Sequence, residues 1–182
     1  MEKLKAQAGP REANLFYSLC ENGQNTIDKT QFKQALFDAG LSSLDFRLKS
    51  LFEKLEKHGD QINFEEFKYF TRIGGLLAEK ALRGELAVPD FRDFSRNLDK
   101  IYDEVLPNRS GDLARYIPPL AEVDPEQFGI AVVTTDGQIY QRGDTNVDFS
   151  IQSMCKPFNY SFAIEKLGLE KVNRHVGVEP SG

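Results

Sequence analysis

Ser153 and Lys156 form the only Ser-x-x-Lys pair in this chain of 182 residues. At this spacing the two side chains lie on one face of a helical turn, because residues three apart are neighbours on a helix. A serine hydroxyl attacks a carbonyl only when a nearby base accepts its proton. A lysine amine can act as that base when burial or a neighbouring charge favours its uncharged form. The pair therefore indicates acyl transfer through a serine nucleophile.

Pro157, which directly follows Lys156, indicates where the helix that carries this pair begins. Proline is tolerated best in the first turn of a helix, where backbone N–H groups lack partners in any case. We therefore expect a helix that begins close to Ser153 and ends before Gly168. At a helix N-terminus the macrodipole favours an alkoxide, and exposed N–H groups can hold the oxyanion of an acyl intermediate.

The same residues also allow a purely structural interpretation. Ser-x-x-Lys fixes only two residues and occurs by chance in many chains. Cys155 could be a thiol nucleophile, but no histidine is close in sequence, and His175 has no recognisable setting. A buried, unreactive thiol is the more usual role of such a cysteine.

Composition narrows the classes of function. The net charge is −5, and the sequence has no basic footprint for nucleic acid. It has no run of about 18 apolar residues and starts without a secretory signal, so we expect no membrane-spanning helix. Two cysteines cannot make a disulfide framework and favour a reducing compartment. We expect the cytoplasm, with the mitochondrial matrix as the alternative, and no zinc site.

The first part of the chain contains a near-duplication of one helical pattern. In the first copy a helix is interrupted at 21–25, and a second helix opens at 28–32. That second helix has Leu36 and Phe37 on its apolar face and Gly40 as its stop. The pattern predicts one helix–loop–helix unit.

The second copy repeats this order. Apolar residues at helical spacing precede a break at 57–60, and a last helix opens at 63–67. An isoleucine follows each loop, Ile27 in the first copy and Ile62 in the second. Two such units predict a paired EF-hand.

The residues at the expected ligand positions argue against calcium. With each isoleucine at the eighth loop position, positions 1, 3, 5 and 12 hold Cys20, Asn22, Gln24 and Gln31 in the first loop, and Leu55, Lys57, Gly59 and Glu66 in the second. A calcium loop needs several carboxylates, one of them a bidentate glutamate. We therefore expect no bound metal and interpret the pair as a helical docking module.

The second part changes from helical to strand-forming patterns. Helical periods at 76–86 and 90–106 are followed by an apolar, β-branched run at 128–134. An alternating run at 138–141 returns after Asp136-Gly137, a strong hairpin signal. Because an isolated hairpin is marginal in water, it needs further sheet or covering helices.

These patterns divide the chain into three parts. We expect a degenerate EF-hand-like helical domain at 1–75, a helical linker that starts the next domain at 76–110, and the opening of a larger domain at 111–182. The fold class is α+β.

The run 143–157 resembles the serine-dependent glutaminases, together with 116–118 before it and 176–182 after it. Those enzymes are similar in fold and in their Ser-x-x-Lys pair to β-lactamases and penicillin-binding proteins. The EF-hand-like module and the linker at 88–91 are similar to the long, kidney- and liver-type branch, so the resemblance covers about Leu15 to Gly182. It implies an all-α EF-hand-like domain followed by the opening part of a β-lactamase-like α/β domain.

The resemblance implies hydrolysis of glutamine to glutamate and ammonia. Ser153 would attack the side-chain amide carbon, and Lys156 would act as base and proton shuttle. Tyr116 would lie in the substrate pocket, and Gln152 would border it. No cofactor is implied, whereas a homo-oligomer, commonly a tetramer, is. The family completes its pocket with Asn, Glu and Tyr residues beyond the position of Gly182, so we expect these 182 residues alone to be inactive.

Two other classes of function remain open. The chain could be a non-catalytic EF-hand-like interaction module, which its amphipathic helices would suit. It could also be a penicillin-recognising serine enzyme, since those share Ser-x-x-Lys. The second alternative is weaker, because such enzymes work outside the cytoplasm and the sequence shows no export signal.

Overall fold

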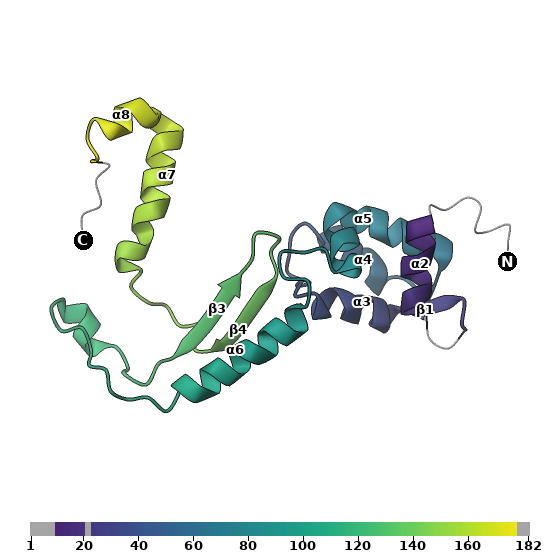
Figure 1. Cartoon of the computed structure of the whole chain (residues 1–182), viewed down its shortest axis with the longest axis horizontal. Helices are drawn as coiled ribbons and strands as arrows, with labels where there is room; N and C mark the ends of the chain where they lie inside the picture. Colours follow the sequence, from purple (N-terminus) through teal and green to yellow (C-terminus); the bar gives the residue numbers. More distant parts are fainter. Residues whose placement is uncertain (1–9, 21–22, 178–182) are drawn as a thin grey trace. The chain divides into compact units, whose positions relative to one another are not determined.

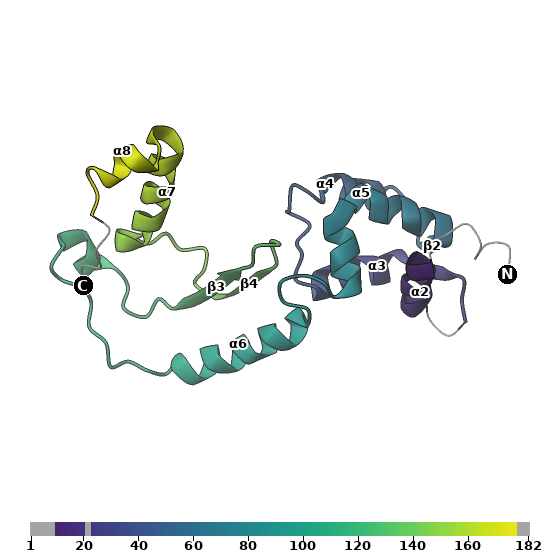
Figure 2. The same ribbon diagram turned by 45° about the horizontal axis from the view of Figure 1, so that its top comes forward.

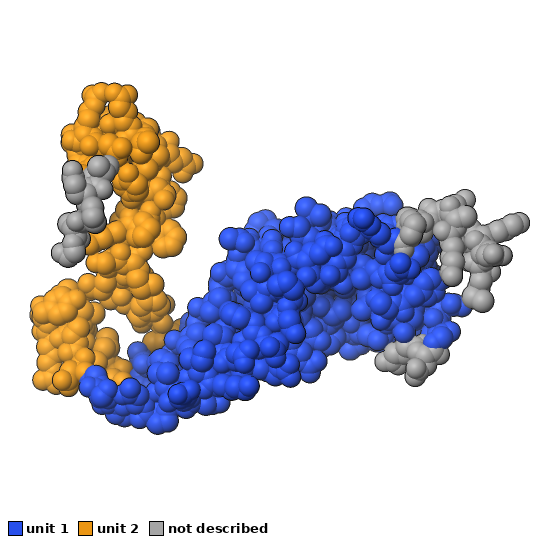
Figure 3. Space-filling model, viewed as in Figure 1, with its two compact units in different colours: residues 1–111, 126–145 blue, residues 112–125, 146–182 orange. Residues whose placement is uncertain are grey.

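The computed structural model describes residues 10–20 and 23–177, and the chain divides into two compact units (Figure 3). The first unit consists of residues 1–111 and 126–145, and the second of residues 112–125 and 146–182. The helical module, the linker and the hairpin all belong to the first unit. The second unit contains Ser153 and Lys156.

The helical module is a paired EF-hand, as the sequence predicts. Its elements are α2 (Pro10–Leu19), β1 (Thr26–Asp28), α3 (Lys29–Asp38), α4 (Lys49–Glu56), β2 (Gln61–Asn63) and α5 (Phe64–Arg83) (Figure 1). The two short strands pair antiparallel, with Ile27 directly opposite Ile62, and both side chains are fully buried. This ladder joins the two helix–loop–helix units at their loops, which is why an isoleucine follows each loop.

Aromatic side chains fill the core of the module. The ring of Phe32 meets Phe67 edge to face at 5.8 Å, and Phe67 meets Phe16 at 5.4 Å, a geometry that suits aromatic quadrupoles. Leu36 is fully buried as expected, but Phe37 is 40% exposed. Successive helical residues are about 100° apart around the axis, so Phe37 falls at the edge of the buried face.

The expected boundary at 73–75 is a kink rather than the end of a helix. Gly75 adopts φ 61° and ψ −159°, outside the helical region, while α5 continues on both sides of it. The helix expected at 76–86 is therefore the second half of α5, which ends before the left-handed Gly84.

The hairpin consists of β3 (Gly129–Val133) and β4 (Ile139–Gly143), paired antiparallel with Ala131 opposite Gln141. It is covered by α6 (Phe91–Val105), which is capped by Asp90 and runs alongside it (Figures 1 and 2). The helix supplies the covering surface that a bare hairpin lacks.

Arg142 of β4 joins the hairpin to α6. Its guanidinium donates to a carboxylate oxygen of Asp99 at 2.8 Å and of Asp103 at 2.6 Å. The same group lies 4.6 Å from the centre of the Tyr102 ring, and the Tyr140 hydroxyl donates to Asp99 at 2.9 Å. Burial and the Asp99 carboxylate together raise the pKa of Tyr140. Charge, stacking and hydrogen bonding thus fix one end of β4.

Replacing this arginine tests the joint. We expect Arg142→Leu to lower the free energy of unfolding by about 1–2 kcal/mol, because two charge-assisted bonds and a stacking contact are lost from a partly exposed site. The control is Arg96→Leu, which removes one exposed ion pair with Asp93 and should cost less than about 0.5 kcal/mol. Urea denaturation measures both, and equal losses would contradict the role of Arg142.

The second unit contains two short 3₁₀ helices and two α-helices. These are η1 (Pro118–Glu122), η2 (Gln152–Cys155), α7 (Lys156–Leu167) and α8 (Leu169–Asn173). The whole described chain is α+β, as expected. Within residues 10–20 and 23–177, no helix combines the length and apolar composition needed to cross a bilayer.

Candidate active site

The Ser-x-x-Lys pair lies where a 3₁₀ turn passes into an α-helix. Ser153 lies in η2, and Lys156 is the first residue of α7, with Pro157 in its first turn. The backbone N–H of Lys156 donates to the carbonyl of Ser153, which closes the turn between them. Because residues three apart eclipse one another in a 3₁₀ turn, this geometry sets both side chains on one side.

The start of this helix differs from the sequence prediction. The α-helix begins at Lys156 rather than close to Ser153, and Ser153 belongs to the preceding 3₁₀ turn. Short 3₁₀ turns are frequent at helix N-termini, and the proline near the start is compatible with either geometry. The serine still occupies the N-terminal approach to the helix, which the chemistry requires.

Gln152, directly before the serine, has a left-handed backbone with φ 46°. Within the described residues it is the only non-glycine residue with positive φ. Such a conformation costs about 1–3 kcal/mol and persists where the surrounding structure enforces it. Its side-chain Nε2 donates to the hydroxyl of Ser150 at 3.1 Å. Glutamine is not typical of left-handed positions, so the sequence gave no signal of this turn.

The structure brings together three of the four expected site residues. Gln152, Ser153 and Lys156 share one turn, and all three are exposed. Tyr116 lies just before η1 in the same unit and is 75% exposed. Its hydroxyl makes no hydrogen bond to Ser153 in the described part of the chain.

An apolar groove borders the lysine, and the sequence did not reveal it. The groove runs between α7 and α8, where Lys156 meets Ala163, Val172 and Val176. The Tyr160 hydroxyl donates to the Asn173 side chain at 3.1 Å and ties the two helices together. An apolar wall beside an amine excludes water from it, which is a surrounding that a catalytic lysine needs.

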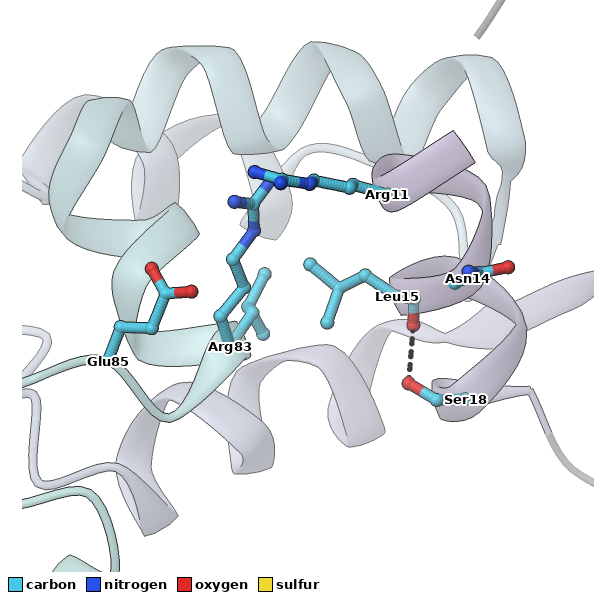
Figure 4. A pocket seen from close by; sticks show the side chains of 7 residues that line it. Arg11, Asn14, Leu15, Ser18, Arg83 and Glu85 are labelled. Atoms are coloured by element: carbon cyan, nitrogen blue, oxygen red, sulfur yellow. Dashed lines mark hydrogen bonds between the residues drawn. The ribbon is translucent and has the colours of Figure 1, made fainter. Parts of the chain in front are cut away.

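A second hollow lies in the helical module, between α2 and the end of α5 (Figure 4). The guanidinium groups of Arg11 and Arg83 approach one another there. Arg83 is paired with Glu79 at 2.6 Å, however, and Glu85 lines the same hollow. The charges nearly balance, and none of the expected site residues lines this hollow.

The second EF-hand-like loop is held by protein groups rather than arranged for a metal. One Glu66 oxygen accepts the backbone N–H of Asn63 at 2.9 Å, and the other lies 3.1 Å from His58. These contacts, the backbone bond first, hold the pKa of Glu66 below its usual value. The Lys29 ammonium donates to the His58 carbonyl at 2.9 Å and lies 3.5 Å from Asp60.

In the first loop, Asn22 lies outside the described residues. Among the residues that the structure describes, no group of three or more His, Cys, Asp or Glu side chains is placed to hold a metal ion. The part of the resembling run at 178–182 also lies outside the described residues.

Comparison with known proteins matches both parts of the chain. The family model described as glutaminase matches residues 111–182, and the model described as EF-hand domain matches residues 11–89. The mitochondrial glutaminase liver isoform of Mus musculus is 33% identical over 174 residues. That alignment covers 92% of this chain and 29% of the relative.

Other matches concern about half of the chain. A thermolabile glutaminase of Rhizobium etli is 48% identical over 91 residues, covering 50% of this chain and 29% of the relative. A crystal structure described as Mglu in its tris and glutamate form covers 48% of this chain and 20% of its own, at 43% identity and a TM-score of 0.46. This chain thus spans 29% of the length of the mouse and Rhizobium etli relatives.

The matched regions coincide with the structural features described above. Residues 111–182 include the hairpin and the Ser153–Lys156 turn, and residues 11–89 include the paired strands and their helices. The chain therefore belongs to the glutaminase family through residues 111–182 and carries an EF-hand domain over residues 11–89.

Proposed function

We propose that the protein hydrolyses the side-chain amide of glutamine to glutamate and ammonia. The observation that carries this proposal is the Ser153–Lys156 turn, which lies inside the segment matched by the glutaminase family. A family likeness alone indicates a reaction class, whereas a serine and a lysine on one turn supply a nucleophile and a base.

The reaction proceeds through an acyl-enzyme. The Ser153 hydroxyl oxygen attacks the carboxamide carbon while Lys156 accepts its proton. The carbon–nitrogen bond then breaks, and Lys156 returns the proton to the departing ammonia. Water, deprotonated by the same amine, cleaves the glutamyl ester and regenerates the serine. Backbone N–H groups at the start of α7 hold the oxyanion.

Tyr116 and Gln152 complete what this chain contributes to the pocket. Tyr116 contacts the substrate, and Gln152 borders the same space. The remaining pocket residues belong to the part of the domain that these 182 residues do not include, and no cofactor takes part. The family resemblance supports a β-lactamase-like domain and a homo-oligomer, commonly a tetramer. The mitochondrial name of the mouse relative favours the mitochondrial matrix over the cytoplasm.

An ammonia-release assay tests this function. We expect the full-length protein to release ammonia from glutamine and to act on asparagine much more slowly, because the pocket must fit the longer side chain. The 182-residue chain alone should release none. Absence of release from glutamine by the folded full-length protein would refute the proposal, and covalent labelling of Ser153 by a β-lactam would favour a penicillin-recognising enzyme.

A second candidate function is a non-catalytic interaction module. The observation that favours it is a loop of the EF-hand domain in which Leu44 is 92% exposed and Phe46 is 84% exposed. Large exposed apolar side chains mark contact sites when they gather. A folded full-length protein without glutaminase activity would support this reading.

The left-handed turn gives a further prediction. Gln152→Val should destabilise the turn by about 1–2 kcal/mol and lower kcat for glutamine, because a β-branched residue resists positive φ. Gln152→Gly keeps the backbone and removes the side chain, so we expect it to retain kcat and raise KM. Steady-state kinetics of the full-length variants measure both. Equal kinetics for the two variants would show that the backbone conformation is unimportant.

A further inference from the structure

Gln138 is a fully buried polar side chain at the tip of the hairpin. Its Nε2 donates to the backbone carbonyls of Ala39 and Val88, each at 2.8 Å. Its Oε1 accepts the backbone N–H of Val88 at 2.9 Å and the hydroxyl of Thr134 at 3.2 Å. Every donor of the amide is used, as expected of a buried polar group that is retained. One side chain thus joins the EF-hand domain, the linker and the hairpin.

The neighbouring residues of the hairpin tip, residues 134–139, reinforce this joint. The Asp136 carboxylate accepts the backbone N–H of Ala87 at 2.7 Å. The Asp136 carbonyl accepts a bond from the Arg47 guanidinium at 2.6 Å. The backbone N–H of Ile139 donates to the carbonyl of Gly40 at 2.9 Å. The contacts come from segments far apart in the sequence, so they form only when the EF-hand domain is folded.

Strand β4 is therefore held at both ends. The hairpin tip binds the EF-hand domain and the linker, and Arg142 binds Asp99 and Asp103 of α6. The chain leaves β4 at Gly143, and residues 144–152 lead directly to Ser153. A short connection transmits a displacement of its fixed end to the residue that follows it.

We propose that the EF-hand domain is an internal anchor for the glutaminase site and that Gln138 is a positioning residue for Ser153. This rests on the proposed glutaminase function. Gln138 does not touch substrate; it holds the strand from which the nucleophile segment starts. Catalysis depends on nucleophile placement to within about 1 Å, so a loosened strand lowers the rate without removing a reacting group. The surface of a metal-free EF-hand pair is thus used within the chain.

The test compares full-length Gln138→Leu with Gln141→Leu. Leucine at 138 leaves the carbonyls of Ala39 and Val88 without their donor, whereas Gln141 is exposed on the same strand. Two readouts are needed at a temperature where circular dichroism shows both variants folded. One is kcat and KM for glutamine, and the other is amide hydrogen exchange over residues 147–157.

We expect Gln138→Leu to lower kcat by about tenfold or more, with KM within about threefold, and to speed exchange over 147–157. Gln141→Leu should change neither. Gln138→Glu should resemble Gln138→Leu near neutral pH. Relative to wild type it should recover as the pH falls, since only the protonated carboxyl can donate a hydrogen bond. A loss caused only by unfolding would not show this recovery in folded protein.

A folded Gln138→Leu protein with unchanged exchange over 147–157 overturns the anchor. If wild type itself releases no ammonia, the proposed function fails, and hydrogen exchange still decides whether the anchor exists. If Gln138→Leu does not fold, Thr134→Val weakens the same joint by removing one hydroxyl and is judged by the same two readouts.

Discussion

Ser153→Ala in the full-length protein is expected to lower kcat for glutamine by about 10⁴-fold or more, because removing a catalytic serine abolishes the covalent route. The thermal unfolding midpoint should stay unchanged, since the Ser153 side chain is exposed and carries no hydrogen bond in the described part of the chain. Initial rates of ammonia release and a thermal melt of the same sample measure the two effects.

Lys156→Met provides the matched control. If Lys156 is the base, this variant should lose activity to a similar extent, and the double variant should lose little more, because groups that act as one unit are not additive. Undiminished turnover by folded Ser153→Ala would remove the serine from the mechanism. A Lys156→Met loss far smaller than the serine loss would assign the base to another residue.

Local sequence signals predicted the elements that position this pair. Asp136-Gly137 marked the hairpin turn, and Pro157 marked the start of a helix to within one turn. Ile27 and Ile62 marked the strands that join the two EF-hand units, and these are paired in the structure. Each signal depends on residues close in the chain, where spacing and backbone preference decide the outcome.

The features that sequence could not reveal depend on distant partners or on enforced conformations. The partners of Gln138 are backbone groups at 39 and 88, and a backbone group has no signature in the sequence. An isolated glutamine in an alternating strand suggests the exposed face, as Gln141 confirms. The left-handed conformation of Gln152 contradicts its residue type, which is typical of positions where function has overridden local preference.

Gly40→Ala is expected to lower the free energy of unfolding by about 3 kcal/mol. Gly40 ends α3 with φ 86°, and Leu41 N–H donates back to the Leu36 carbonyl at 3.1 Å. A left-handed alanine costs about 1 kcal/mol. A methyl group here would also lie 2.5 Å from the ring of Phe91, the first residue of α6, and such overpacking costs about 2 kcal/mol. Urea denaturation gives the total.

Gly23→Ala separates the two contributions. Gly23 is also left-handed, with φ 79°, but nothing lies within 4 Å of the position its methyl group would take. It should therefore cost only the conformational part, about 1 kcal/mol. The difference between the variants measures how firmly Phe91 is held against the end of α3. Equal losses would mean that α6 yields freely at this point, and the EF-hand domain would then depend on Gln138 and its neighbours alone for its hold on the hairpin.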